Sequence, residues 1–355
     1  MRWLFLASII ILSVLNSSGQ ISRGGIPLKI PVLKSKGIPV AEMPPVVNSE
    51  LRRLAEKERR EEPFLKPFRF AHSFDVKISP ETEGLWISDI AGYDVWVLKL
   101  HSKGALSLNI IFEDFHLPDG ARLFLYNRKE EFCLGAFTSL NNKVFGKFAV
   151  SPLPGDEITV QYEVPAGLAE RFNFIIGQVN HDFTGILKLN EYRPSGRLPG
   201  SCHIDVNCEA AKEWNDVKDA VCRFIVGSDI CTGTLVNNTS EEEKPYILTA
   251  AHCFRRLNNP ETALFTFNYE SPYCAVLEGD PSNSISGAFM RAYSDSLDFA
   301  LVELTLAPPP RFRPYYAGWN NSGSIPDSTA SIHHPQGHLK KISVDYDKPV
   351  INDIG

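Results

Sequence analysis

The amino-acid sequence predicts an all-β protein whose N-terminal half contains an antiparallel β-sandwich. Apolar and smaller or polar residues alternate from Leu106 to Phe112 and from Ile158 to Val164. A period of two buries one face of a strand and leaves the other in water. Turn-forming residues punctuate the pattern at 117–120 (LPDG) and 153–156 (LPGD). Several short strands joined by such turns are typical of a sandwich, which we expect over residues 73–190.

Length and charge narrow the possible functions. The chain has 355 residues, enough for two or three domains, and its net charge is −6. Nucleic-acid binding usually needs a concentrated basic face, and the sequence has no such block. We therefore expect no nucleic acid among its partners.

Residues 1–19 are expected to be a signal peptide. Arg2 precedes the apolar stretch Trp3 to Leu15, and small residues follow it before Gln20. This stretch is shorter than the roughly 20 residues that a membrane span needs. We therefore expect a secreted protein, extracellular or periplasmic, with no membrane association after signal removal. A buried helix or a retained anchor is the alternative.

Residues 20–72 are expected to be a proline-rich and charged pro-segment. Its first part contains prolines at 27, 31, 39, 44 and 45, which disfavour a helix or a central strand. Residues Glu50 to Glu62 are dense in charge, and their few apolar positions predict a short amphipathic helix. The sandwich that follows has no cluster of acidic residues and histidines that looks catalytic, so we expect a structural or inhibitory role for it.

A basic link with prolines and glycines, residues 191–200, is expected to separate the sandwich from a cysteine-rich region. An exposed link of this kind is accessible to an activating cleavage, although a plain linker fits equally well. Export favours disulfides for the seven cysteines, six of which lie between residues 202 and 274. No C-x2-C spacing suggests zinc, and we expect no cofactor. An odd number leaves at least one cysteine free or paired outside this chain.

The segment Tyr246 to Cys253 contains a candidate catalytic base. An apolar strand ends in small residues, followed by His252 and Cys253. A catalytic base needs a fixed ring orientation and access to substrate. A disulfide at Cys253 would anchor the loop that carries it, and Cys231 on an upstream strand is a possible partner.

A candidate acid follows at Asp298, which opens the apolar strand 299–304. A partly buried carboxylate needs a partner, and an imidazole N–H is a suitable one. Asp295 is the competing acid, but it lacks an immediately following apolar strand. We therefore select Asp298. We interpret the neighbouring His333 and His334 as structural, because adjacent strand residues point to opposite faces and chelate poorly.

The segments TAAHC (249–253) and DFALVEL (298–304) resemble the histidine and aspartate motifs of trypsin-like serine proteases. Residues 200 to 345 resemble the bacterial lysyl endopeptidase family more closely. Further motifs occur in the family's order: SCHIDVNC at 201–208, CTGTLVNNT at 231–239, FNYESPYC at 267–274, AGWN at 317–320 and IHHP at 332–335.

The resemblance implies that residues 201–355 form the first β-barrel, and the start of the second, of a chymotrypsin-like protease domain. It implies His252 as general base and Asp298 as the residue that orients it. It also implies the pairs Cys231–Cys253 and Cys208–Cys274, with Cys202 joined to a cysteine beyond residue 355. Cys133 and Cys222 have no family counterpart that we identify.

The same resemblance implies a precursor whose own pro-region is a partner and whose processing occurs near Arg197. Its substrates would be proteins or peptides, with cleavage after lysine. No glycine-rich serine motif follows Asp298, and the Ser322 segment reads as a turn. We expect a fragment that lacks the nucleophilic serine and is inactive alone. The alternative is a secreted non-catalytic pseudoprotease or binding protein that acts through its sandwich.

Overall fold

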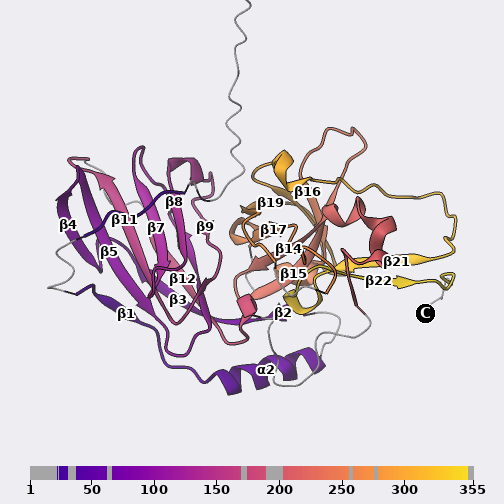
Figure 1. Cartoon of the computed structure of the whole chain (residues 1–355), viewed down its shortest axis with the longest axis horizontal. Coiled ribbons are helices and arrows are strands. Elements are labelled where there is room, and N and C mark those ends of the chain that lie inside the picture. Colours follow the sequence, from indigo (N-terminus) through magenta and orange to yellow (C-terminus); the bar gives the residue numbers. More distant parts are fainter. Residues whose placement is uncertain are drawn as a thin grey trace, which may run out of the picture.

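The computed structural model describes residues 22, 24–30, 37–61, 66–168, 174–188, 203–255, 259–275 and 279–350. It confirms an all-β architecture, in which two lobes built mainly from antiparallel strands lie side by side (Figure 1). The expected signal peptide, the link at 191–200 and Cys202 lie outside the described residues. No helix in the described ranges combines the length and apolar character needed to cross a bilayer.

The first lobe, called the sandwich, contains two sheets. Its strands are β1 (Val40–Glu42), β3 (Ala71–Ile78), β4 (Leu85–Ile90), β5 (Tyr93–His101), β6 (Ser107–Glu113), β7 (Arg122–Asn127), β8 (Cys133–Phe137), β9 (Phe148–Ala149), β10 (Leu153–Pro154), β11 (Glu157–Pro165) and β12 (Ile175–Asp182). One sheet has the order β1-β5-β11-β7-β8 with β4 beside β5, and the other has the order β10-β6-β12-β3 with β9 beside β6. Strand β1 therefore adds part of the expected pro-segment to the first sheet.

Large aromatic side chains fill the space between the two sheets. Trp96, Phe112, Phe148 and Tyr162 are fully buried there. The Phe112 ring packs edge-on against Phe174, with 5.4 Å between ring centroids. Burial of one such side chain contributes about 1.5–3 kcal/mol, so this core accounts for much of the stability of the sandwich.

Strand β11 is buried on both faces, whereas alternation alone predicts one wet face. The reason is the segment 24–30, which covers its polar face. Leu28 donates its N–H to Glu163 Oε1 at 2.7 Å, and its carbonyl accepts from Gln161 Nε2 at 2.9 Å. Glu163 also pairs with Arg122 at 2.6 Å. Gln161 and Glu163 of β11 are thus paired with protein groups in place of water.

Helix α2 (Asn48–Glu61) runs beneath both lobes (Figure 1). It begins two residues before the expected helix, and none of its residues is fully buried. Two side chains attach it to the sandwich: Asn48 Oδ1 lies 2.7 Å from His181 Nε2, and Arg52 Nε donates to the Phe183 carbonyl at 2.6 Å. Polar anchors, more than an apolar stripe, therefore hold α2 in place.

The second lobe, called the barrel, contains one large sheet. Its strands are β2 (Phe68–Arg69), β14 (Val221–Val226), β15 (Asp229–Val236), β16 (Tyr246–Thr249), β17 (Leu264–Phe267), β18 (Ser284–Ser286), β19 (Ala288–Ser294) and β20 (Phe299–Leu304). Their order is β18-β17-β14-β15-β16-β20-β19, with β2 beside β15. The outermost strands β18 and β19 are separated in sequence only by Gly287, so the sheet curls until its ends meet. Phe224, Phe265 and Val302 lie in the enclosed core.

A smaller sheet and a buried charge network complete this lobe. The sheet has the order β13 (Ile204–Asp205), β22 (Lys341–Asp345) and β21 (Thr329–His333).

The buried charge network is centred on Glu270. Glu270 pairs with Lys218 at 3.0 Å and with Lys340 at 2.9 Å. All three side chains are at most 8% exposed. Burial by itself would raise the pKa of Glu270, but the two ammonium groups lower that pKa below its ordinary value.

Candidate active site

His252 lies in a short 3-10 turn, Ala251–Phe254, that follows β16 directly. The antiparallel register of β16 and β20 pairs Thr249 with Ala300. Beyond this pair, the chain continues from β16 forward in sequence to His252. At the same end of the sheet, the residues that precede β20 lead back to Asp298. The two residues predicted from the sequence are therefore brought together by the pairing of their strands.

Asp298 ends the loop between β19 and β20. Its backbone lies in the left-handed region, with φ 48°, a conformation that aspartate adopts more readily than most residues. The Asp298 N–H donates to the Asp295 carbonyl at 3.4 Å. This turn directs the carboxylate toward the turn that carries His252.

Both carboxylate oxygens of Asp298 accept hydrogen bonds from His252. The ring Nδ1 lies 2.8 Å from Oδ2, and the backbone N–H donates to Oδ1 at 2.9 Å. Burial alone would raise the pKa of Asp298, but these hydrogen bonds lower that pKa below its ordinary value. An ionised carboxylate only accepts, so Nδ1 donates to Asp298, and in the tautomer that this bond selects Nε2 can accept a proton.

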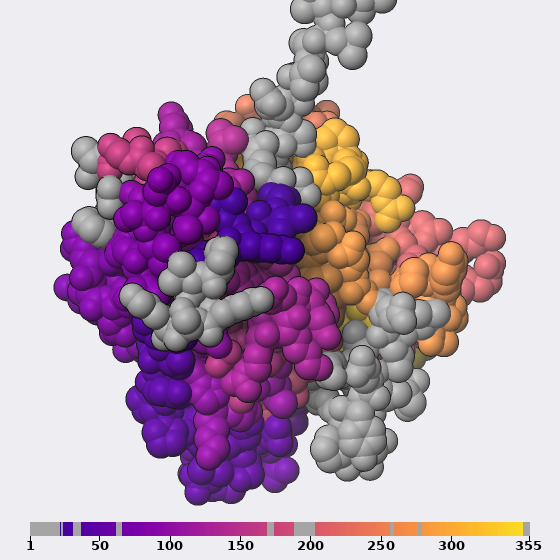
Figure 2. Space-filling view, turned by 60° about the vertical axis from the view of Figure 1, so that its left-hand side comes forward, coloured from indigo at the N-terminus to yellow at the C-terminus, as the bar shows by residue number. Residues whose placement is uncertain are grey.

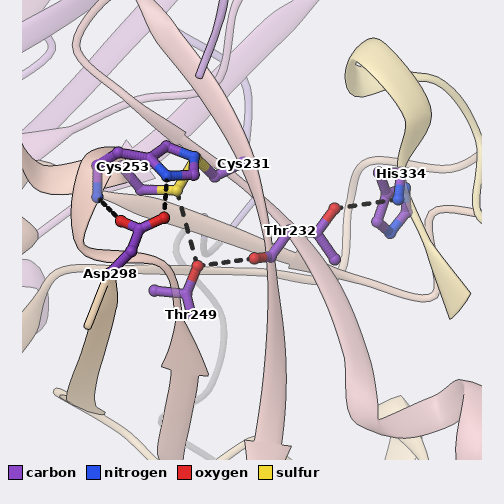
Figure 3. The surroundings of a disulfide bond; sticks show 7 residues. Cys231, Thr232, Thr249, Cys253, Asp298 and His334 are labelled. Carbon is purple, nitrogen blue, oxygen red and sulfur yellow. Dashed lines mark hydrogen bonds and ion pairs between the residues drawn. A yellow bond between two sulfur atoms is a disulfide. The ribbon is translucent and has the colours of Figure 1, made fainter. Parts of the chain in front are cut away.

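A disulfide fixes the His252 turn to the sheet. Cys231 on β15 is bonded to Cys253, with 6.2 Å between their Cα atoms. Thr249 Oγ1 supports the same region by donating to the Thr232 carbonyl at 2.8 Å (Figure 3). The turn that carries the candidate base is thus held from two sides, by a covalent bond and by the carboxylate of Asp298.

The other expected cysteines have different positions. Cys208 and Cys274 form a second disulfide with 4.5 Å between their Cα atoms. Cys222 and Cys133 are free thiols, the first buried in the barrel and the second exposed on the sandwich. Burial raises the pKa of Cys222 to about 12, so this thiol is inert at neutral pH.

Asp295, the competing acid, turns away from the ring. Its carboxylate accepts from Arg255 Nε at 2.7 Å and from the Tyr293 hydroxyl at 3.1 Å. Arg255 and Tyr293 were not among the residues predicted for the site. Because Arg255 directly follows the His252 turn, the pair ties that turn to the loop that carries Asp298. The sequence signal for the contact between Arg255 and Asp295 was the charge of Arg255 three residues after His252.

The candidate metal ligands do not form a metal site. The described residues contain one cluster of His, Cys, Asp or Glu with donor atoms close together: Cys231, His252 and Cys253. Both of its sulfurs belong to the disulfide, so neither is a thiolate ligand. His334 is buried with Nδ1 2.9 Å from the His338 carbonyl, while the His333 ring packs edge-on against His203. The two histidines therefore face different partners.

The serines of the expected turn contact each other. Ser322 Oγ lies 2.7 Å from Ser324 Oγ, and both residues are exposed. The Ser322 N–H donates to Asn320 Oδ1 at 2.9 Å. These contacts belong to a local turn.

Comparison with known proteins agrees with the motifs. Residues 198–355 match the family described as lysyl endopeptidase, C-terminal domain. A protein named lysyl endopeptidase from Pseudomonas aeruginosa is 28% identical over 279 residues, which cover 73% of this chain and 59% of that protein. The chain thus spans less than two thirds of the length of this relative.

Proposed function

The C-terminal part of the chain, residues 198–355, belongs to the lysyl endopeptidase family, and from this premise we propose that the protein is the precursor of a secreted serine endopeptidase. The observation that carries the proposal is the contact between His252 Nδ1 and Asp298 Oδ2 at 2.8 Å. An imidazole whose one nitrogen is hydrogen-bonded to a carboxylate can activate a hydroxyl nucleophile through its other nitrogen.

In this mechanism His252 Nε2 takes the proton of a serine hydroxyl as the serine oxygen attacks the peptide carbonyl. Asp298 stabilises the imidazolium that forms and keeps the ring in one orientation. The same proton then passes from Nε2 to the leaving amine. We propose that the serine and the oxyanion donors belong to sequence that follows residue 355, and that proton transfer needs no metal or cofactor.

The substrates would be proteins or peptides. The name of the Pseudomonas relative supports cleavage after lysine, and the proposal extends this specificity to the present protein. Residues 1–19 would direct export, and cleavage within 191–200 would separate the pro-region from the protease part. Secretion also suits the two disulfides, which persist in oxidising compartments.

A covalent probe tests the proposal. The reading frame is extended past residue 355, and the full-length product is treated with a fluorophosphonate that labels activated serines. We expect one labelled serine, with labelling lost in His252→Ala and kept in the matched control Asp295→Asn. A folded full-length product without labelling, or with labelling that survives His252→Ala, would refute the proposal and favour a non-catalytic binding protein.

A further inference from the structure

A strand from the N-terminal part of the chain extends the sheet of the barrel. In β2, Arg69 pairs with Asp229 and Phe68 pairs with Ile230 on β15. At these positions the other neighbour of β15 is β14, which pairs Val226 with Asp229. Strand β2 therefore occupies an edge of the barrel sheet that the strands from residues 203–350 do not fill, as in recognition by strand addition.

The chain passes from one lobe to the other at Phe70. Its N–H donates to the Ser228 carbonyl of the barrel at 2.9 Å, and its own carbonyl accepts from Phe183 of the sandwich at 3.1 Å. The Ala71 N–H also donates to Ser228, at 3.3 Å. Backbone hydrogen bonds thus connect both lobes around this residue.

An apolar cluster surrounds the crossing. Phe70 and Ile186 from the N-terminal part are fully buried against Ile225 and Ile230 of the barrel, each of which is 3% exposed. Burying such side chains together removes apolar surface of both lobes from water. We call β2 and this cluster the first contact area.

A second contact area lies at the other side of the interface. Ser286 exchanges two hydrogen bonds with the backbone of Ala149, at 3.4 and 3.2 Å. The Phe145 ring packs edge-on against Phe289, with 5.5 Å between centroids. A Cβ on Gly287 would come within 2.8 Å of the Phe145 ring, so this position needs glycine for close approach.

Two polar contacts extend the second area. Lys147 pairs with Glu261 at 3.1 Å, with the side chains 32% and 29% exposed, and Lys143 donates to Thr305 Oγ1 at 3.2 Å. Figure 2 shows the N-terminal lobe packed directly against the C-terminal lobe. The two lobes are therefore joined by strand pairing, apolar burial and polar contacts, none of which depends on the peptide bonds of 189–202.

The second area leaves the candidate catalytic pair uncovered. Ser286 and Thr305 lie at the open end of the β19–β20 hairpin, whereas Asp298 lies in its loop. Six strand residues separate the two ends, which at about 3.3 Å per residue is about 20 Å. This area can hold the sandwich without blocking the pair.

We propose that the sandwich remains bound to the barrel as a non-covalent partner after the chain is cut within residues 191–200. The proposal rests on the proposed function only for the statement that this cut occurs in nature. The partner surface on the barrel is the β14–β15 turn together with the end of β19–β20 remote from Asp298.

The test uses the full chain with a site-specific protease recognition sequence in place of residues 193–199. After complete cleavage, we expect both fragments to elute together in gel filtration at micromolar concentration and to appear as a 1:1 complex in native mass spectrometry. Hydrogen exchange provides a second readout that requires no destabilising variant: the amides of Phe70 and Ala71 should stay protected after cleavage. Separate elution together with loss of that protection would overturn the proposal.

Variants locate the interface. Phe145→Ala should speed fragment dissociation at least tenfold, while Val144→Ser, at a neighbouring side chain that is 91% exposed, should leave it unchanged. Equal effects of the two would overturn the second contact area. Neither measurement uses catalysis, so absent serine labelling would refute the proposed function alone, and separated fragments would refute retention alone.

Discussion

His252 makes two hydrogen bonds to one carboxylate, because both its ring Nδ1 and its backbone N–H reach Asp298. The acid therefore fixes the ring and the turn that carries the ring at the same time. The contact through Nδ1 orients the ring, and the contact through the backbone N–H joins the turn itself to Asp298.

If the proposed function is right, Asp298→Asn should disable the full-length protein as a peptidase. An asparagine amide offers one acceptor oxygen for the two donors of His252, so it favours the wrong tautomer of the ring. We expect kcat to fall about 10⁴-fold, the loss typical when the triad acid becomes neutral. Steady-state kinetics with a lysyl peptide checks this. The control is Asp295→Asn, which alters the exposed contacts with Arg255 and Tyr293 and none with His252. Similar losses in both variants would contradict the assignment.

Removal of the Cys231–Cys253 disulfide should destabilise the barrel. The two cysteines are 22 residues apart, and the loop-entropy relation gives about 3 kcal/mol for a loop of this size. We expect the double variant Cys231→Ser/Cys253→Ser to lose about this free energy of unfolding in urea. Cys133→Ser, at an exposed free thiol, should change it little. Unchanged stability of the double variant would show that the bond does not constrain the barrel.

Glu270→Gln should be more damaging than loss of a surface ion pair. It leaves Lys218 and Lys340 buried without the carboxylate that they pair with, which costs about 3–5 kcal/mol. Glu61→Gln breaks the pair with Lys57, whose side chains are 57% and 65% exposed, and should cost less than about 1 kcal/mol. Adding Lys340→Met to Glu270→Gln should recover part of the loss. Urea unfolding measures all three, and equal losses in the two single variants would exclude the network as a determinant of stability.

Acid should destabilise the sandwich through His181. Burial disfavours the charged ring, and the charge of His72 adds to this, so the pKa of His181 is lowered to about 4. In the unfolded chain a histidine has a pKa of about 6.5. As the pH falls from about 6.5 to 4, the unfolded chain therefore binds a proton that the folded lobe does not, and stability decreases by up to about 3 kcal/mol.

His181→Gln removes this titration, so its unfolding free energy should depend less on pH over the same range. Urea unfolding followed by tryptophan fluorescence, to which the buried Trp96 contributes, measures this dependence. His116→Gln, at an exposed position, is the control and should keep the parent's pH dependence. The parent's slope in His181→Gln would assign the effect to other groups.

Local patterns predicted the all-β class well. The alternation at 106–112 and 158–164 falls within or beside β6 and β11, and the apolar strand after Asp298 distinguished it from Asp295. These signals are local because a strand's period and its first residue are properties of a short segment.

Features set by distant partners were not predictable. Strands β1 and β2 have three and two residues, too few to show a period, and each exists because a longer strand accepts it. The network of Lys218, Glu270 and Lys340 joins residues up to 122 positions apart, so no spacing in the sequence indicates it. The burial of β11 on both faces likewise depends on the separate segment 24–30.

Only Phe70 stands between β2 in one sheet and β3 in another. With its ring buried and both of its backbone groups bonded, this residue cannot act as a hinge. Rotation of one lobe against the other would have to break the pairing of Arg69 with Asp229 or of Ala71 with Asp182. A relative movement of the two lobes at this point therefore costs backbone hydrogen bonds in at least one of the two sheets.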